Sequence, residues 1–293
     1  MARNIRTTVV TTLCCITLGA GITACEETSP TPSKASAAAD SFSGTKKIRV
    51  EGRSVNVSCS GGQADGKPVV IVMAGLDDGL KKTAAFRKIL SEKNRVCSYD
   101  RLGEGASDAP AGPQTIAASG KILTGVLNQV VGDGPVVLAG HSLGGLLAAR
   151  YAPDHQDQVK GLVLMDATSP TSNGDIEKVI PKSATGDSAD LRTQTVAVGE
   201  GQNPEKLAFP DAEVRSAGNI PVEVIQHGTK YLGQFPVYGN GLEKVWSEGQ
   251  HKWTAVSGRS KLSTAAGSGH YIYVDRTELA VKAVQRVAAQ AAE

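Results

Sequence analysis

Residues 135–149 read PVVLAGHSLGGLLAA. The apolar run, the Gly-rich turn and the Ala- and Leu-rich end predict a buried strand, a tight turn and a helix. Ser142 lies in the turn, in the pattern Gly-x-Ser-x-Gly. When a strand and a helix are joined this sharply, their backbones pass close together near the serine. A Cβ atom has no room two positions before or two positions after the serine, which explains Gly140 and Gly144. The stretch therefore predicts a strained turn that exposes the Ser142 hydroxyl.

The rest of the chain predicts one α/β domain over residues 46–293, because strands alternate with helices along it. Strands are expected at 46–50 and 54–58, as a hairpin, and at 68–73, 95–99, 159–165, 221–226 and 261–265. Helices are expected at 80–91, 114–131, 242–257 and 277–292. This order gives a mostly parallel sheet with helices on both faces and a ligand site at the carboxyl ends of the strands. Residues 168–219 contain many breaks and predict a small cap insertion.

Three polar side chains follow strands at this predicted edge. Ser142 follows the central strand, Asp166 follows the strand at 159–165, and His270 follows the last strand. A serine needs a histidine to take its proton when it attacks a carbonyl, and an acid to hold that histidine in the right tautomer. Among the other histidines, His227 ends a strand at the same edge and could line the pocket. We therefore expect Ser142, Asp166 and His270 to belong to one site.

The chain resembles enzymes of the α/β-hydrolase fold. The residues that carry the resemblance are Gly140–Gly145, Tyr99–Ser107 and Ser268–His270, and it extends from about Lys46 to the C-terminus. Within this family, the chain resembles exported actinobacterial members with a lipid anchor. The resemblance implies the chain order serine, acid, histidine, which makes Ser142, Asp166 and His270 the expected catalytic triad.

The acid departs from the pattern of this family. Its usual place follows the strand at 221–226, where no carboxylate occurs until Glu243. Some relatives, including certain haloalkane dehalogenases and lipases, carry the acid one strand earlier, as Asp166 does here. Glu243 and Glu248 remain alternative candidates for the acid, and either one would require a loop to fold back. Asp275 follows His270 too closely and begins a helix.

The resemblance also implies an oxyanion hole, which needs two preorganised N–H donors. The N–H group of Leu143, directly after the serine, is one donor, and that of Leu76 in the loop after the strand at 68–73 is the other. Asp77 and Asp78, just beyond, are expected to cap the following helix.

A serine hydrolase that cleaves small carboxylic esters through an acyl-enzyme is the expected function. A thioesterase, an acyltransferase, a peroxidase without cofactor, and a non-catalytic surface lipoprotein that uses the fold for binding remain alternatives. No cofactor or metal is expected, because no metal-ligand spacing occurs. The net charge of +2 and the aromatic content of 4% give no reason to expect nucleic acid as a partner.

Residues 1–24 resemble the signal peptide of a bacterial lipoprotein. Arg3 and Arg6 precede the short apolar stretch 9–20, and Cys25 follows small residues. The resemblance implies that Cys25 takes a lipid and anchors the protein to the membrane. An ordinary secretory signal and a short membrane anchor remain alternatives. Residues 25–45 are rich in Ser, Thr, Pro and Ala and predict a disordered tether. The expected location is outside the cytoplasm, lipid-anchored or secreted.

Cysteine use agrees with export. Of the five cysteines, three lie within the first 25 residues, which leaves Cys59 and Cys97 in the predicted domain. An even pair outside the cytoplasm predicts a disulfide, and two buried thiols are the alternative.

Overall fold

The computed structural model describes residues 42–63 and 66–293. All of them belong to one compact unit. The predicted signal peptide, Cys25 and most of the predicted tether lie outside the described residues. The first strand begins at Gly44, within the segment predicted as tether.

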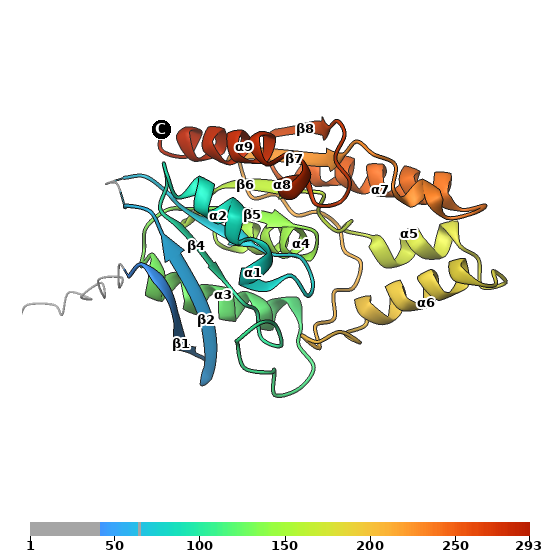
Figure 1. Ribbon diagram of the computed structural model, residues 1–293, viewed down its shortest axis with the longest axis horizontal. Coiled ribbons are helices and arrows are strands. Elements are labelled where there is room, and N and C mark those ends of the chain that lie inside the picture. Colours follow the sequence, from blue (N-terminus) through green and yellow to red (C-terminus); the bar gives the residue numbers. More distant parts are fainter. Residues whose placement is uncertain (1–41, 64–65) are drawn as a thin grey trace, which may run out of the picture. The chain divides into compact units, whose positions relative to one another are not determined.

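The described residues form a single sheet of eight strands (Figure 1). The strands are β1 (Gly44–Val50), β2 (Arg53–Ser60), β3 (Val69–Met73), β4 (Val96–Tyr99), β5 (Val136–His141), β6 (Val159–Met165), β7 (Pro221–His227) and β8 (Arg259–Ala265). Their order in the sheet is β1-β2-β4-β3-β5-β6-β7-β8. β2 pairs antiparallel with β1 and with β4, and every other pairing is parallel. The prediction of a mostly parallel sheet is therefore confirmed.

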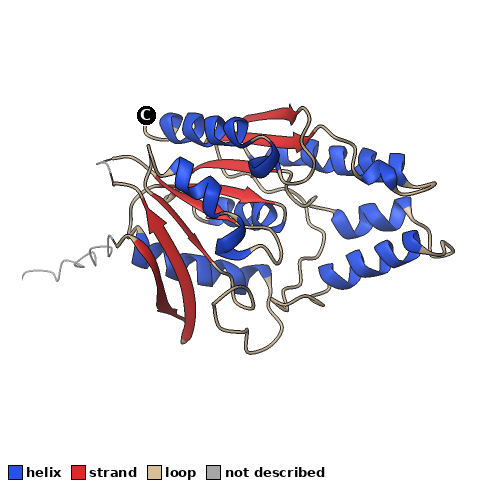
Figure 2. Cartoon of the chain, in the orientation of Figure 1, coloured by secondary structure: helices blue, strands red, loops and turns tan. Residues whose placement is uncertain are grey.

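The apolar strands are buried on both faces because successive side chains point to opposite sides. In β3, Val70 and Val72 pack with one group of helices, whereas Ile71 and Met73 pack with the other. Helices α2 and α9 cover the first face, and α3 and α4 cover the second (Figure 2). The α-helices are α1 (Gly79–Lys82), α2 (Ala84–Leu90), α3 (Ile116–Val130), α4 (Leu143–Tyr151), α5 (Ser172–Val179), α6 (Asp187–Gly199), α7 (Gly239–Trp253), α8 (Ile272–Asp275) and α9 (Thr277–Gln290). Short 3₁₀ turns are η1 (Ala152–Asp154), η2 (Leu232–Gln234) and η3 (Thr254–Val256).

The segment predicted as a cap contains two helices, α5 and α6. They lie beyond the carboxyl ends of the parallel strands, next to α7 (Figure 1). Ile176 and Ile180 pack against Leu242 of α7 and form a small apolar cluster of their own. This cluster attaches α5 to α7.

The predicted helix at 80–91 is divided at Thr83 into α1 and α2. The Thr83 hydroxyl donates a hydrogen bond to the carbonyl of Leu80, 3.4 Å away. A threonine side chain that bonds to the backbone competes with regular helical hydrogen bonding. The sequence pattern of apolar positions continues through this break and does not reveal it.

Cys59 and Cys97 form a disulfide. They lie directly opposite each other on β2 and β4, with their Cα atoms 4.1 Å apart. Both residues are buried. The bond therefore fastens the antiparallel hairpin β1-β2 to the parallel part of the sheet.

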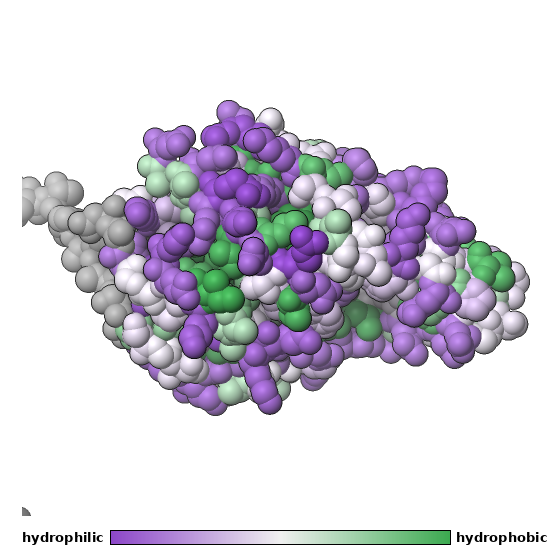
Figure 3. Space-filling view, turned by 45° about the horizontal axis from the view of Figure 1, so that its top comes forward, coloured by the Kyte–Doolittle hydropathy of each residue, from purple (hydrophilic) through white to green (hydrophobic). Residues whose placement is uncertain are grey.

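Hydrophilic residues cover most of the face shown in Figure 3, and apolar residues occupy separate areas between them. Across residues 42–63 and 66–293, no helix combines the length and the apolar character that crossing a membrane requires.

Candidate active site

Ser142 lies at the sharp turn between β5 and α4. Its backbone has φ 51° and ψ −122°, a strained conformation for a residue with a side chain. A Cβ on Gly140 would lie 2.5 Å from the carbonyl oxygen of Gly144, and a Cβ on Gly144 would lie 2.3 Å from that of Met73. Both glycines are therefore required for the close approach, as the sequence predicted.

Asp166 and His270 are brought together from separate strands. Asp166 follows β6, has no exposed surface and has a positive φ of 46°. His270 lies in the loop after β8, and its Nδ1 is 2.7 Å from Asp166 Oδ2. This bond leaves His270 Nε2 as the free ring nitrogen, as proton transfer from a serine requires. Among the described residues, the structure gives the Ser142 hydroxyl no hydrogen bond, to His270 or to any other group.

Asp166 has a second set of partners that the sequence did not indicate. The backbone N–H of His227 donates to Oδ1 at 3.0 Å, and His227 Nδ1 lies 2.9 Å from Oδ1 and 3.0 Å from Oδ2. The indole N–H of Trp246, on α7, donates to Oδ1 at 2.9 Å. Burial alone raises the pKa of Asp166, but the bonds and charges of His227 and His270 outweigh it and lower the pKa to about 2.

The alternative acids do not contact His270. Glu243 Oε2 lies 2.9 Å from Nε2 of His227. Glu248 pairs with Lys244 on the exposed side of α7. Asp275 accepts hydrogen bonds from the N–H of Gly269 at 2.9 Å and from a neighbouring serine hydroxyl, and so holds the loop that carries His270. Only Asp166 among these four carboxylates is bonded to the His270 ring.

The expected oxyanion donors lie next to the serine and in the loop after β3. Leu143 is the first residue of α4, where an N–H group has no acceptor within its own helix. Leu76 is half-buried in the β3–α1 loop. The backbone of this loop is fixed on one side by Gly144, whose Cα approaches the carbonyls of Met73 and Ala74 too closely to allow a Cβ.

A buried arginine fixes the same loop on its other side. Arg101 is 3% exposed and donates from Nη1 to the carbonyl of Ala74 at 2.7 Å and from Nη2 to that of Gly75 at 3.0 Å. The same side chain donates to Glu104 at 3.0 Å and twice to Glu205 at 2.8 Å. Burial lowers the pKa of Arg101, but the charges of Glu205 and Glu104 outweigh it and raise the pKa.

These contacts join the cap to the loop that carries Leu76. Glu205 belongs to the cap segment, and Glu104 also accepts the N–H of Asp77 at 2.7 Å. Arg101 and Glu104 both lie within the motif at 99–107 that the sequence analysis singled out, but their contacts with the loop after β3 and with Glu205 were not foreseen.

His141 and Asp78 form a further buried contact behind the triad. Nε2 of His141 lies 3.0 Å from the carbonyl oxygen of His270, and its Nδ1 lies 3.5 Å from Asp78. Burial lowers the pKa of His141. Asp78 precedes α1 but makes no capping bond with its side chain, which instead accepts from the hydroxyl of Tyr271 at 3.2 Å. The expectation that Asp78 caps this helix is therefore wrong, because a buried polar partner lies closer to it.

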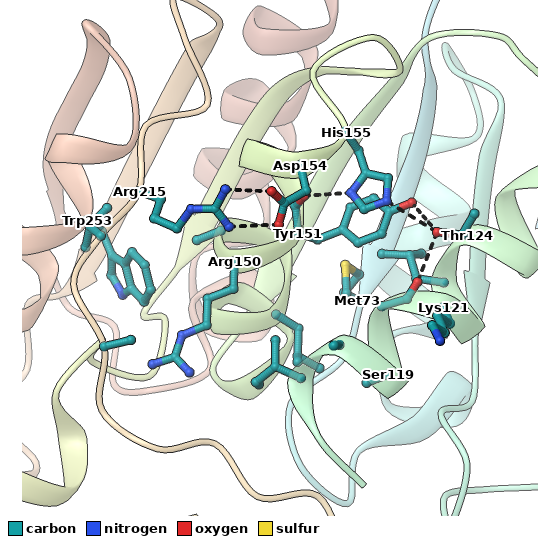
Figure 4. A pocket seen from close by; sticks show the side chains of 18 of the residues that line it. Met73, Ser119, Lys121, Thr124, Arg150, Tyr151, Asp154, His155, Arg215 and Trp253 are labelled. Atoms are coloured by element: carbon teal, nitrogen blue, oxygen red, sulfur yellow. Dashed lines mark hydrogen bonds and ion pairs between the residues drawn. The ribbon is translucent and has the colours of Figure 1, made fainter.

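A separate cavity of about 390 Å³ lies between α3, α4 and the segment at 212–215 (Figure 4). Its lining is mostly apolar and includes Met73 and Trp253. On one side, the hydroxyl of Thr124 lies 2.9 Å from that of Tyr151, whose ring stacks on His155 at a centroid distance of 3.6 Å. Neither Ser142 nor His270 lines this cavity.

No group of three or more His, Cys, Asp or Glu side chains suited to hold a metal ion occurs in the part of the chain that the structure describes.

Comparison with known proteins identifies related chains. Residues 67–240 match the family described as alpha/beta hydrolase fold. Lipase LipV of Mycobacterium tuberculosis is 39% identical over 85 residues, which are 29% of this chain and 32% of that protein. The human (lyso)-N-acylphosphatidylethanolamine lipase is 34% identical over 113 residues, 38% of this chain and 33% of that protein. Each match thus spans about a third of the relative.

Among solved structures, the enol-lactonase from Burkholderia xenovorans LB400 superposes with a TM-score of 0.59 at 18% identity, over 83% of this chain and 99% of that one. At this identity the likeness shows a shared fold.

Proposed function

Since the chain belongs to the α/β-hydrolase fold family, we propose that it is a serine hydrolase that cleaves carboxylic esters through an acyl-enzyme. The observation that carries the proposal is the 2.7 Å bond between Asp166 and His270 at the sheet edge where the strained Ser142 turn also lies. A buried acid on the inner nitrogen of a histidine is the arrangement that a serine nucleophile requires.

In the proposed reaction, the Ser142 oxygen attacks the ester carbonyl and its proton passes to Nε2 of His270. Asp166 keeps the proton of His270 on Nδ1 and stabilises the imidazolium that forms. The N–H groups of Leu143 and Leu76 hold the negative oxygen of the tetrahedral intermediate. The alcohol leaves with the proton from His270, and a water molecule, activated by the same histidine, then releases the acid and restores Ser142.

The relatives support an ester as the bond that is cleaved. Two proteins that match this chain at more than 30% identity are named as lipases. A serine at the turn, in place of an aspartate, also favours acyl transfer over chemistry that needs a carboxylate nucleophile.

Hydrolysis of p-nitrophenyl esters of increasing acyl length tests this function. We expect Ser142→Ala and His270→Ala each to reduce kcat by at least 10³-fold, because the nucleophile and its base act as one unit. Ser263→Ala, at an exposed position on the edge strand β8, is the matched control and should retain full turnover. Full esterase turnover in Ser142→Ala would contradict the mechanism, and wild-type protein inactive on every ester would favour the binding alternative.

We further propose that the protein is exported and held at the membrane by a lipid on Cys25. Residues 1–25 support this proposal, because charged residues are followed by an apolar stretch and then by small residues before Cys25. The Cys59–Cys97 disulfide also supports it, since such bonds persist in oxidising compartments. Expression of the full chain with Cys25→Ala should release the protein from the membrane fraction or leave an unprocessed precursor. Unchanged attachment and gel mobility would contradict it.

A further inference from the structure

His227 occupies the last position of β7, the neighbour of β6 in the sheet. Asp166 directly follows β6, so the parallel pairing places these two residues side by side. His227 contacts Asp166 both through its backbone N–H, at 3.0 Å, and through Nδ1, at 2.9 Å. The contact is therefore built into the sheet and does not depend on a flexible loop.

The other ring nitrogen of His227 faces a second carboxylate. Its Nε2 lies 2.9 Å from Oε2 of Glu243, on α7. Oε1 of Glu243 accepts the backbone N–H groups of Leu232 at 2.7 Å and Gly233 at 3.1 Å, which fixes the carboxylate. An ionised carboxylate can only accept hydrogen bonds, so both ring nitrogens of His227 must donate. A histidine that donates from both nitrogens is an imidazolium.

The surroundings of His227 favour this charged form. Burial alone lowers its pKa, but the hydrogen bonds and charges of Asp166 and Glu243 outweigh it and raise the pKa. Tyr231, from the loop after β7, and Trp246, from α7, also face the ring, with ring centroids 4.8 and 6.2 Å away. Lys230 and Lys244 line the same pocket as His227 and Glu243. His270 also bonds to Asp166 and is the other histidine in the series of contacts that runs from Glu243 through His227 and Asp166.

Asp166 consequently holds two imidazoles on one carboxylate. Oδ2 lies 2.7 Å from Nδ1 of His270 and 3.0 Å from Nδ1 of His227. Oδ1 accepts hydrogen bonds from His227 and from the indole N–H of Trp246. Donors on both oxygens prevent rotation of the carboxylate, so Oδ2 stays directed at His270.

We propose that His227, held between Asp166 and Glu243 with both ring nitrogens donating, is a positioning residue that locks the triad acid Asp166 toward His270. The inference rests on the proposed hydrolase function. Glu243 acts through His227 by holding its proton.

Two measurements test this inference on the full-length protein. In ¹⁵N-labelled protein, NMR should show both ring nitrogens of His227 protonated at pH 7, and Glu243→Gln should lower the pH at which one proton is lost. His227→Gln should reduce kcat by about 10- to 100-fold with little change in KM, because the acid is no longer held in place.

Glu248→Gln is the matched control, since it makes the same substitution on the exposed side of the same helix and should leave both readouts unchanged. If His227→Gln does not fold, Glu243→Gln still decides through the NMR readout and its own kcat. Wild-type kcat in both variants, or a singly protonated His227 at pH 7, would overturn the inference while ester hydrolysis persists. Loss of the proposed function itself would show instead as wild-type protein without esterase activity.

Discussion

Arg101 provides a prediction that separates folding from catalysis. Its guanidinium is 3% exposed and holds the carbonyls of Ala74 and Gly75, which precede the expected oxyanion donor Leu76, together with Glu104 and Glu205. Arg101→Gln leaves two buried carboxylates without a cation. Removal of one partner of a buried ion pair lowers the free energy of unfolding by about 3–5 kcal/mol.

The same change should release the loop after β3. Misplacement of one oxyanion donor reduces kcat by about 10²- to 10³-fold. We therefore expect Arg101→Gln to lose both stability, measured by denaturant unfolding, and kcat, measured on a p-nitrophenyl ester at a temperature where the variant is folded.

The triple variant Arg101→Met, Glu104→Met, Glu205→Met distinguishes the two effects. It removes all three ionisable groups, including Glu104, whose pKa burial raises to about 8, so most of the lost stability should return, because apolar residues often replace a buried ion cluster without penalty. Its kcat should stay low, since Ala74 and Gly75 still lack their donors. A triple variant with wild-type kcat would refute the idea that Arg101 positions the loop, and one as unstable as Arg101→Gln would refute the electrostatic explanation.

Two further predictions follow from the disulfide and from Asp166. The disulfide joins residues separated by 38 positions in the sequence. The double variant Cys59→Ala, Cys97→Ala should therefore have a free energy of unfolding lower by up to about 4 kcal/mol. Reducing agent should have no further effect on that variant. Unchanged denaturation midpoints would show that the sheet alone fixes these strands. Burial raises the pKa of Asp166 but the two histidines lower it to about 2, so its contribution to stability is complete above about pH 4 and is lost as pH falls through 2. Wild type is expected to have a higher free energy of unfolding than Asp166→Asn at pH 5, and this difference should shrink by about 2 kcal/mol when the pH is lowered to 1. A difference that does not change with pH would contradict the low pKa.

The turn at Ser142 could be predicted from sequence because its constraints are local. Gly140 and Gly144 lie two residues from the serine, and the backbone contacts that exclude a Cβ there arise within one strand, one turn and one helix. The positions of Asp166 and His270 also followed from a general rule, since residues after parallel strands meet at one edge. The structure adds the bond that distinguishes Asp166 from Glu243 and Glu248.

The hydrogen bonds and ion pairs that hold the site residues in place could not be predicted, because they form between segments that are distant in the sequence. Arg101 and Glu205 are separated by 104 residues, and His227 and Asp166 by 61. The sequence placed His227 at a strand end on the active edge, but no spacing indicates that it contacts Asp166 or that Glu243 reaches it from α7. Asp78 shows the same limit, because a residue in a typical capping position turns instead to Tyr271.

The measurement that tests the central claim most directly is labelling with a fluorophosphonate probe, followed by mass spectrometry of the digested protein. Such a probe bonds covalently to a serine that a neighbouring histidine activates. The account predicts one adduct, on the peptide that contains Ser142, which disappears in Ser142→Ala and is strongly reduced in His270→Ala. Folded wild-type protein without an adduct, or with an adduct on another serine, would contradict it.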